Sequence, residues 1–366
     1  MLKTYQLRNY NFTLLILVLL LTTMGVVFIN LADSSFTSKQ ILGLILGLGV
    51  VIFMSLIDCK YWWVLYIVNC FVLLMVKLVG YEVNGARRWF KIPKFGPPQP
   101  SEFAKIVMIV CVAIFLEKHK DDLNRFKTLA KLAVLCAVPV LLIAIETDLS
   151  TSLDLTIVLI MMIFVGGLSY KIIATVLAVM IPLIYGLLYY IDHAKNVILL
   201  KEYQVNRIKT FLHPSDDLSQ DDVLQQKNSV MAIGSGMLKG KQWGESGITV
   251  SDANLVSEQQ TDFIFSIVGE RFGFIGCIIV IAFLLLIMLQ CIGIARKAKN
   301  VSGMLIATGL ASMICFQSFI NISVATQMLP NTGLPLPFVS YGLSSLLSLM
   351  MRVGIVLNVG LQRRKY

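Results

Sequence analysis

Residues 11–32 read NFTLLILVLLLTTMGVVFINLA, an apolar run without a single charged side chain. A transmembrane helix needs about 20 consecutive and mostly apolar residues. The run is longer than the core of a signal peptide and lacks a clear cleavage site, so we interpret it as a retained transmembrane span.

Nine further apolar runs follow, and the sequence therefore predicts about ten transmembrane helices. The runs cover residues 11–32, 38–57, 61–80, 103–117, 129–145, 151–168, 171–191, 263–295, 302–325 and 339–361. Only helices and closed barrels satisfy every backbone polar group in lipid, and runs of this length indicate helices. We expect an all-α, polytopic membrane helix bundle that forms a single domain over residues 1–366.

The composition agrees with a membrane protein. The chain has 366 residues, of which 57% are hydrophobic and 14% charged, whereas soluble domains have about 25% charged residues. The net charge is +10, but the basic surface with interleaved aromatics that nucleic-acid binding requires is missing, so no nucleic-acid partner is expected. The seven cysteines form no CxxC or Cys/His cluster, which indicates buried thiols rather than disulfides or zinc ligands.

The charges between the runs predict the orientation of the bundle. With a cytoplasmic N-terminus, most basic loop residues fall on the inside, as the positive-inside rule requires, and both termini are cytoplasmic. The segments expected outside are 81–102, 146–150, about 192–262 and 326–338. The segment 192–262, before the eighth span, is polar and longer than a minimal connector, so we interpret it as a long extracytoplasmic loop.

Ionisable residues at membrane depth are costly and are therefore functional candidates. Glu102 and Lys105 stand three residues apart at the start of the fourth span, where they form either part of a site or a structural ion pair. Asp148 lies in the turn before the sixth span and is either a site residue or a solvated turn residue. Asp154, just inside that span, either caps the helix or pairs with Lys105.

Asp262 stands where the long loop enters the eighth span. A carboxylate at the aqueous boundary, beside low-dielectric protein, is suited to act as a general base. The alternative is a helix N-cap, because Thr261-Asp262 before an apolar run is an ordinary start signal.

Cations near the outer interface suggest an anionic ligand. Arg87 and Arg88 precede Trp89 in the first large outer segment, and guanidinium groups beside an aromatic ring suit a phosphate or pyrophosphate. Alternatively, Trp89 is an interfacial belt residue. Further cations of the long loop, for which the alternative is a solvated surface, are Arg207, Lys209, Lys239 and Lys241.

The segment 333–342, GLPLPFVSYG, opens the last span. Two prolines among glycines predict irregular backbone at membrane depth. Such backbone is tolerated only where it is buried or lines a cavity.

Seven segments, in this order along the chain, resemble the SEDS family (shape, elongation, division and sporulation), whose members include RodA, FtsW and SpoVE. They are GARRWF at 85–90, QPSEFAK at 99–105, TDLSTS at 147–152, YQVNRIKTFLHP at 203–214, AIGSGMLKGK at 232–241, TDFIFSIVGERFGFIG at 261–276 and GLPLPFVSYG at 333–342. The resemblance implies a peptidoglycan glycosyltransferase of the bacterial cytoplasmic membrane. Its substrate would be lipid II, a disaccharide-peptide on undecaprenyl pyrophosphate, and its partner a class B penicillin-binding protein. Lys239-Gly240-Lys241 looks slightly more like the RodA type.

The same resemblance assigns roles to residues. Asp262 matches the catalytic aspartate. The residues expected to bind substrate or pyrophosphate are Arg87, Arg88, Trp89, Arg207 and Lys239, and those expected to support the site are Glu102, Lys105, Asp148, Glu258 and Thr261. The chain departs from the family pattern at Thr147, Ser150, Asn228, Gln260 and Leu343, which suggests a divergent member.

The resemblance implies an inverting transfer in which Asp262 is the base and the cations offset the charge of the leaving pyrophosphate. No cofactor is assigned with certainty, and a divalent cation, Mg²⁺ or Mn²⁺, could share that role with Asp262 as a ligand. A lipid II flippase and a non-catalytic scaffold of the cell-wall machinery are the alternatives. The candidate residues gather on the outer side without a charged path to the inside, which favours the transferase.

Overall fold

The computed structural model describes residues 10–57, 62–83, 86–90, 98–146, 148–193, 205, 208–209, 221–241 and 258–362, without the side chains of residues 62–63, 82–83, 86–87 and 221–223. Ten long helices match the ten predicted spans. They are α1 (Phe12–Ala32), α2 (Thr37–Leu56), α3 (Trp62–Val79), α4 (Pro100–Lys118), α5 (Phe126–Ile145), α6 (Leu149–Val165), α7 (Tyr170–His193), α10 (Ile264–Arg296), α11 (Val301–Ala325) and α12 (Leu343–Leu361). A short 3₁₀ helix, η3 (Ser34–Phe36), joins α1 to α2.

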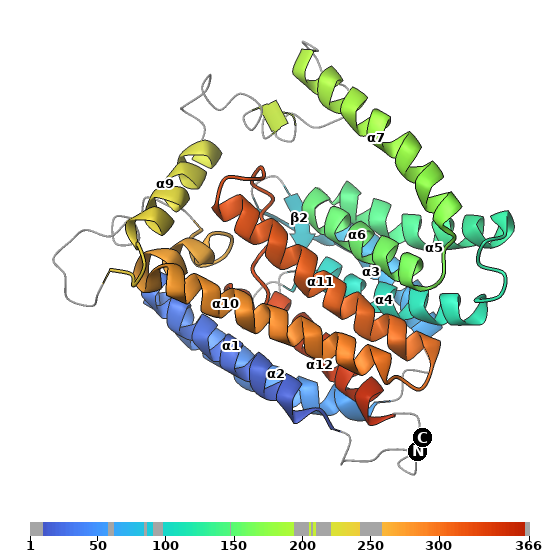
Figure 1. Cartoon of the computed structure of the whole chain (residues 1–366), viewed down its shortest axis with the longest axis horizontal. Helices are drawn as coiled ribbons and strands as arrows, with labels where there is room; N and C mark the ends of the chain where they lie inside the picture. Colours follow the sequence, from blue (N-terminus) through green and yellow to red (C-terminus); the bar gives the residue numbers. More distant parts are fainter. Residues whose placement is uncertain are drawn as a thin grey trace.

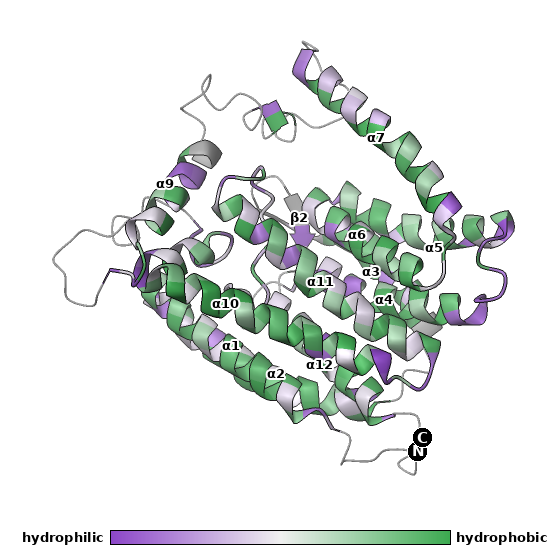
Figure 2. Cartoon of the chain, viewed as in Figure 1, coloured by the Kyte–Doolittle hydropathy of each residue, from purple (hydrophilic) through white to green (hydrophobic). Residues whose placement is uncertain are grey.

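Seven of the described helices are long and apolar enough to cross a membrane by length and composition alone. The other three spans are α3, α6 and α4. Helix α6 and residues Val64–Val79 of α3 form shorter apolar helices. Helix α4 is less apolar because it carries four charged residues, Glu102, Lys105, Glu117 and Lys118. Hydrophobic residues make up most of the helices of the bundle, while hydrophilic residues are more frequent in the connections (Figure 2).

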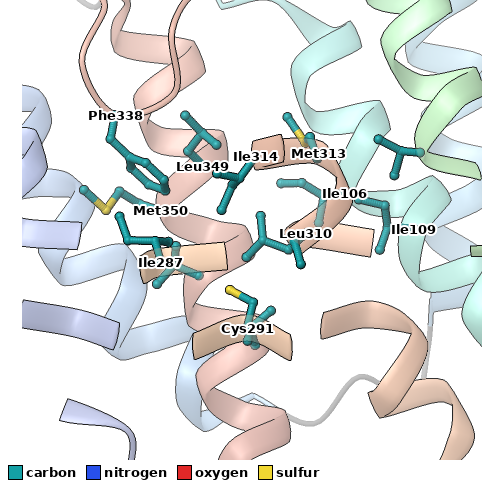
Figure 3. Close-up of a cluster of buried hydrophobic side chains, with 14 of the residues drawn as sticks. Ile106, Ile109, Ile287, Cys291, Leu310, Met313, Ile314, Phe338, Leu349 and Met350 are labelled. Atoms are coloured by element: carbon teal, nitrogen blue, oxygen red, sulfur yellow. The ribbon is translucent and has the colours of Figure 1, made fainter. Parts of the chain in front are cut away.

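Helix α11 lies in the middle of the bundle and packs against α4, α6, α10 and α12 (Figure 1). The buried core between these helices includes Ile106, Leu310, Ile314 and Met350. Phe338, from the segment before α12, points into the same cluster (Figure 3). The core therefore joins the regular spans to the segment that the prolines predict to be irregular.

That irregular segment, residues 333–342, contains no helix, as predicted, and most of its residues are buried, although Gly333 is exposed. In lipid its backbone carbonyls need partners, and α11 supplies two of them from side chains one turn apart. The Nε2 of Gln317 donates to the carbonyl of Pro335 at 2.8 Å, and the Nδ2 of Asn321 donates to that of Leu334 at 2.7 Å. Gly25 of α1 allows the segment to pack closely against this helix, since a Cβ there would lie only 2.8 Å from the carbonyl oxygen of Phe338.

The start of α1 and the end of α12 lie at the same end of the bundle. The Nδ2 of Asn358 in α12 donates to the carbonyl of Ser55, at the end of α2, at 2.8 Å. Because α1 and α2 form a tight hairpin through η3, the end of α2 lies beside the start of α1. We call the opposite end, where the irregular segment lies, the site end.

Two features add to the predicted helix bundle. A short two-stranded antiparallel hairpin, β1 (Tyr81–Val83) and β2 (Ala86–Trp89), follows α3. The long loop also contains a helix, α9 (Asp221–Ser235).

Helix α7 lies apart from the other spans (Figure 1). Ile191 is its single buried residue among the described side chains. Its apolar surface therefore faces outward around nearly the whole helix, as expected of a helix in contact with lipid.

Candidate active site

The turn of residues 258–263 carries Asp262 to the start of α10. The backbone N–H groups of Thr261 and Asp262 donate to the carbonyl oxygen of Glu258 at 3.0 and 3.2 Å. Helix α10 has Phe263 as its N-cap, and no side chain makes the capping hydrogen bond. The alternative that Asp262 caps the eighth span is therefore wrong, because Asp262 lies inside a separate turn ahead of the cap.

Asn321 of α11 fixes this turn against the irregular segment. Its buried Nδ2 donates at 2.8 Å to the carbonyl oxygen of Asp262, in addition to its bond with Leu334. Ser340 of the irregular segment adds a second link, since its Oγ donates to the carbonyl oxygen of Thr261 at 2.6 Å. The backbone that carries Asp262 is thus held from two sides by buried polar groups.

The carboxylate of Asp262 lies against Gly333, the first residue of the irregular segment. A Cβ on Gly333 would lie 3.4 Å from the Oδ2 of Asp262. Gly333 also has φ 69°, a backbone conformation that favours glycine. The half-buried carboxylate therefore meets the irregular segment where that segment presents no side chain.

Asp148 organises a second group of polar residues at the site end. It is 3% exposed and caps α6 by accepting from the backbone N–H of Thr151 at 3.2 Å. It also accepts from Gln99 Nε2 at 2.7 Å, and its Oδ1 lies 3.5 Å from Arg88 Nη1. The alternative of a solvated turn residue is wrong, because the start of α4 and Arg88 cover this carboxylate.

Arg88 and Trp89 are neighbours in β2 and contact each other. The guanidinium carbon of Arg88 lies 4.9 Å from the centre of the Trp89 ring, within the range of a cation–π interaction. Arg88 is therefore held by the ring and by Asp148 together. It keeps 29% of its side chain exposed, as a residue that binds an anionic ligand requires.

Glu146 lies beside this pair and was not predicted as a site residue. It is buried after the end of α5. Burial raises the pKa of its carboxyl to about 8, the nearby charge of Asp148 adds to the rise, and Arg88 opposes it. Glu146 therefore titrates near neutral pH next to Arg88 and Asp148.

Four buried charged residues, which we call the charge cluster, connect α4, α6 and α12: Glu102, Lys105, Asp154 and Arg352. Lys105 Nζ lies 2.8 Å from Glu102 Oε1 and 3.6 Å from Asp154 Oδ2. Arg352 Nη2 lies 3.1 Å from Glu102 Oε2, and Ser348 Oγ donates to the same oxygen at 3.0 Å. The predicted pairing of Glu102 with Lys105 is confirmed, as is the alternative in which Asp154 pairs with Lys105. Two positive and two negative side chains leave the cluster neutral, which is the arrangement that burial of charge requires.

Short links join these groups. In the first turn of α4, Ser101 Oγ donates to Asp148 at 3.4 Å, while its neighbour Glu102 belongs to the charge cluster. In the first turn of α6, Ser150 Oγ donates to the carbonyl of Thr332, directly before the irregular segment. The Asp262 turn, the Arg88–Asp148 pair and the charge cluster therefore form one connected site.

Of the remaining predicted residues, Glu258 and Thr261 lie in the Asp262 turn, whereas the others are not placed in the site by the described part of the chain. Arg207 and the side chain of Arg87 lie outside the described residues. Lys239 is exposed, and no hydrogen bond or ion pair connects it to Asp262 in the described part of the chain. Glu258 is exposed and accepts from Thr261 Oγ1 at 3.3 Å, inside the turn itself.

Besides Glu146, three residues of the site were missed, and each left a signal in the sequence. Arg352 is the single charged residue in the last apolar run, so the rule that flags intramembrane charges applies to it. Gln317 and Asn321 stand four residues apart in the ninth run and so share one helix face. Their spacing indicates polar partners for backbone groups.

The described residues contain no group of three or more His, Cys, Asp or Glu side chains that could hold a metal ion. The six described cysteines are free thiols.

Fold and site together define a multi-pass membrane protein with a carboxylate-centred polar site at one end of its helix bundle. The chain belongs to the FtsW/RodA/SpoVE family, because the model of that family, described as cell cycle protein, matches residues 6–365.

Known proteins agree with this membership over nearly the whole chain. Stage V sporulation protein E of Bacillus subtilis is 34% identical, covering 94% of this chain and 95% of that protein. A probable peptidoglycan glycosyltransferase FtsW of Geobacter sulfurreducens is 32% identical, covering 98% of this chain and 97% of its own. A chain in the structure of a peptidoglycan synthase complex superposes with a TM-score of 0.80 at 27% identity, covering 96% of this chain and 97% of the other.

Proposed function

We propose that this protein is a peptidoglycan glycosyltransferase that polymerises lipid II, with Asp262 as its general base. The observation that carries the proposal is the placement of Asp262. A half-buried carboxylate lies on a turn that Asn321 and Ser340 fix by hydrogen bonds, and its Oδ2 lies beside Gly333, a residue without a side chain. The family membership and the name of the Geobacter relative point to the same reaction.

In the reaction, the 4-hydroxyl oxygen of the acceptor sugar attacks the anomeric carbon of the donor. The new C–O bond forms as the bond from that carbon to undecaprenyl pyrophosphate breaks, with inversion at the carbon. Asp262 takes the hydroxyl proton, and the electron pair leaves with the pyrophosphate. Arg88, which Trp89 and Asp148 orient, offsets the charge that develops on the leaving group.

The proposal places the site at the outer face of the bacterial cytoplasmic membrane, with both termini inside. The positive-inside pattern of the loops supports this orientation, and the start of α1 and the end of α12 lie at the end of the bundle opposite the site. A class B penicillin-binding protein is the proposed partner, since the similar chain of known structure is part of a synthase complex.

A resident metal ion does not fit the described side chains, because no three suitable ligands converge. A Mg²⁺ or Mn²⁺ ion that arrives with the pyrophosphate would share Asp262 as a ligand, and we assign it no step.

Purified protein incubated with lipid II tests the proposal, with and without a class B penicillin-binding protein. We expect the wild type to form glycan strands, whereas Asp262→Ala forms none and remains folded. Asp33→Asn is the matched control, because Asp33 is a half-buried carboxylate at the end of α1, near the Asp262 turn, and asparagine can also cap η3.

Glycan formed by Asp262→Ala at the wild-type level would contradict the assignment of the base. If the wild type moves lipid II across vesicles but never polymerises it, the flippase replaces the transferase. A protein that does neither, alone or with the partner, is a scaffold.

A further inference from the structure

Residues 236–241 form a tight loop after α9 that lies on the side of α10. The backbone N–H groups of Phe274 and Ile275 donate to the carbonyl oxygens of Met237 and Leu238 at 2.9 and 3.3 Å. These donors are unpaired within the helix because α10 is broken at Gly273, which has φ 63°. The carbonyl groups of the loop therefore accept the hydrogen bonds that the break leaves open in α10. These bonds fix the position of the loop along the helix axis.

Glycines make this contact close. A Cβ on Gly240 would lie 2.3 Å from the carbonyl oxygen of Arg271, and a Cβ on Gly273 would lie 2.4 Å from the nitrogen of Gly240. Lys241 closes the loop, since its Nζ lies 2.7 Å from the buried Glu270. Backbone packs against backbone here, so the loop cannot slide along the helix.

The loop contacts α10 where the uncharged, apolar part of that helix begins. Residues 272–295 contain no charged side chain, between Arg271 and Arg296. This stretch rises about 36 Å, slightly more than the roughly 30 Å hydrocarbon core of a bilayer. Phe274 and Ile275, the hydrogen-bond partners of the loop, are 59% and 46% exposed on the outside of the bundle. The lipid boundary therefore crosses α10 beside the loop.

The part of the loop that points away from α10 is apolar with a lysine at its end. We call Met237, Leu238 and Lys239 the tip. Met237 is 79% exposed and Leu238 58%, and Lys239 is exposed as well. Two large exposed apolar side chains followed by a lysine are typical of a segment that enters the membrane interface, with the ammonium among the head groups.

We propose that the tip is a membrane anchor: Met237 and Leu238 enter the acyl region of the outer leaflet, and Lys239 contacts phospholipid phosphates. Lipid is the expected contact because the tip is hydrogen-bonded to Phe274 and Ile275, on the exposed surface of a membrane span. The exposed surface of the tip continues that lipid-facing surface. The anchor ties α9 and the end of the long loop to the membrane surface. Lys239 then binds bulk phospholipid instead of the substrate pyrophosphate that the sequence suggested.

The test is site-specific photocrosslinking of the full-length protein in nanodiscs of phosphatidylglycerol and phosphatidylethanolamine. Benzoylphenylalanine replaces Met237 or Leu238, one at a time, and mass spectrometry measures lipid adducts. Phe274 is the positive control. Leu224, exposed at the far end of α9, is the matched control on the same element.

We expect lipid adducts at positions 237 and 238 comparable to those at 274 and several-fold above those at 224. Adducts at 274 without adducts at 237 and 238, or crosslinks from the tip to protein instead, would overturn the proposal. Because the readout is contact with lipid, its outcome does not depend on whether the protein polymerises lipid II.

Discussion

Helices α4 and α7 were both predicted as spans, yet their environments are opposite. Most of α4 is buried at the centre of the bundle, including Glu102 and Lys105. Among the described side chains of α7, Ile191 alone is buried, and the helix lies apart (Figure 1). The more apolar helix is the one that faces lipid, while the less apolar helix carries charges and connects the site. In this pair of helices, the more hydrophobic sequence belongs to the helix that faces lipid. The buried charged residues belong to the helix that forms part of the site.

The largest effect on stability is expected when one charge is removed from the charge cluster that contains Glu102 and Lys105 of α4. Arg352→Met removes one of the two buried cations that pair with Glu102 and leaves the cluster with an excess negative charge, and loss of a buried ion-pair partner costs about 3–5 kcal/mol of unfolding free energy. Adding Glu102→Gln should recover most of that loss, because the remaining Lys105–Asp154 pair is neutral. Unfolding in detergent measures both variants.

The matched change on α7 is Tyr185→Leu, at a side chain that is 71% exposed. Its unfolding free energy should change by no more than about 0.5 kcal/mol. Equal losses in Arg352→Met and Tyr185→Leu would contradict the distinction between the two helices.

Removing Asn321 should have the next largest effect. In Asn321→Ala the carbonyls of Asp262 and Leu334 lose their donor, and unsatisfied buried carbonyls cost about 1–3 kcal/mol each. We expect a clear fall in kcat for lipid II polymerisation with little change in KM, because the base moves while Arg88 keeps its place. A change confined to KM would argue against a positioning role.

Gly333→Ala tests the contact between the irregular segment and Asp262. The left-handed conformation of Gly333 costs a residue with a Cβ about 1–2 kcal/mol, and the added methyl group would touch Asp262 Oδ2. Unfolding free energy should fall by that amount, and polymerisation should fall more than in Gly234→Ala, whose Cβ would meet no neighbouring atom. Equal unfolding free energy and equal polymerisation in Gly333→Ala and Gly234→Ala would contradict a role for the contact between Gly333 and Asp262.

The last prediction concerns Glu146 and the dependence of stability on pH. The folded pKa of about 8 lies above the ordinary value of 4.5, so the folded state binds the proton more tightly and loses stability as pH rises from about 4.5 to 8. Glu146→Gln removes this loss. Its advantage in thermal unfolding over the wild type should be near zero at pH 4 and grow up to pH 8, and an advantage independent of pH would exclude titration of Glu146 as its cause.

Much of the fold was predictable from the sequence, because apolar runs in lipid must form helices. The ten spans, the irregular segment 333–342 and the Glu102–Lys105 pair follow from run length, prolines and spacing. The hairpin β1–β2 and helix α9 did not, since their segments carry no clear periodicity.

Residue types alone could not decide between alternatives that depend on tertiary contacts. Asp148 and Asp262 each precede an apolar helix, yet Asp148 caps its helix and Asp262 does not. The partners that make the difference, Arg88 and Asn321, come from distant parts of the chain. Lys239 illustrates the same limit, because its distance from Asp262 along the sequence says nothing about which surface it occupies.

The central claim is that Asp262 performs chemistry rather than holding the fold together, and Asp262→Asn tests it most directly. Binding and polymerisation of lipid II are measured on the same purified variant. We expect a Kd for lipid II close to that of the wild type and no glycan product, because the amide keeps the shape of the carboxylate but cannot accept the proton. Glycan at the wild-type rate from Asp262→Asn would contradict the claim.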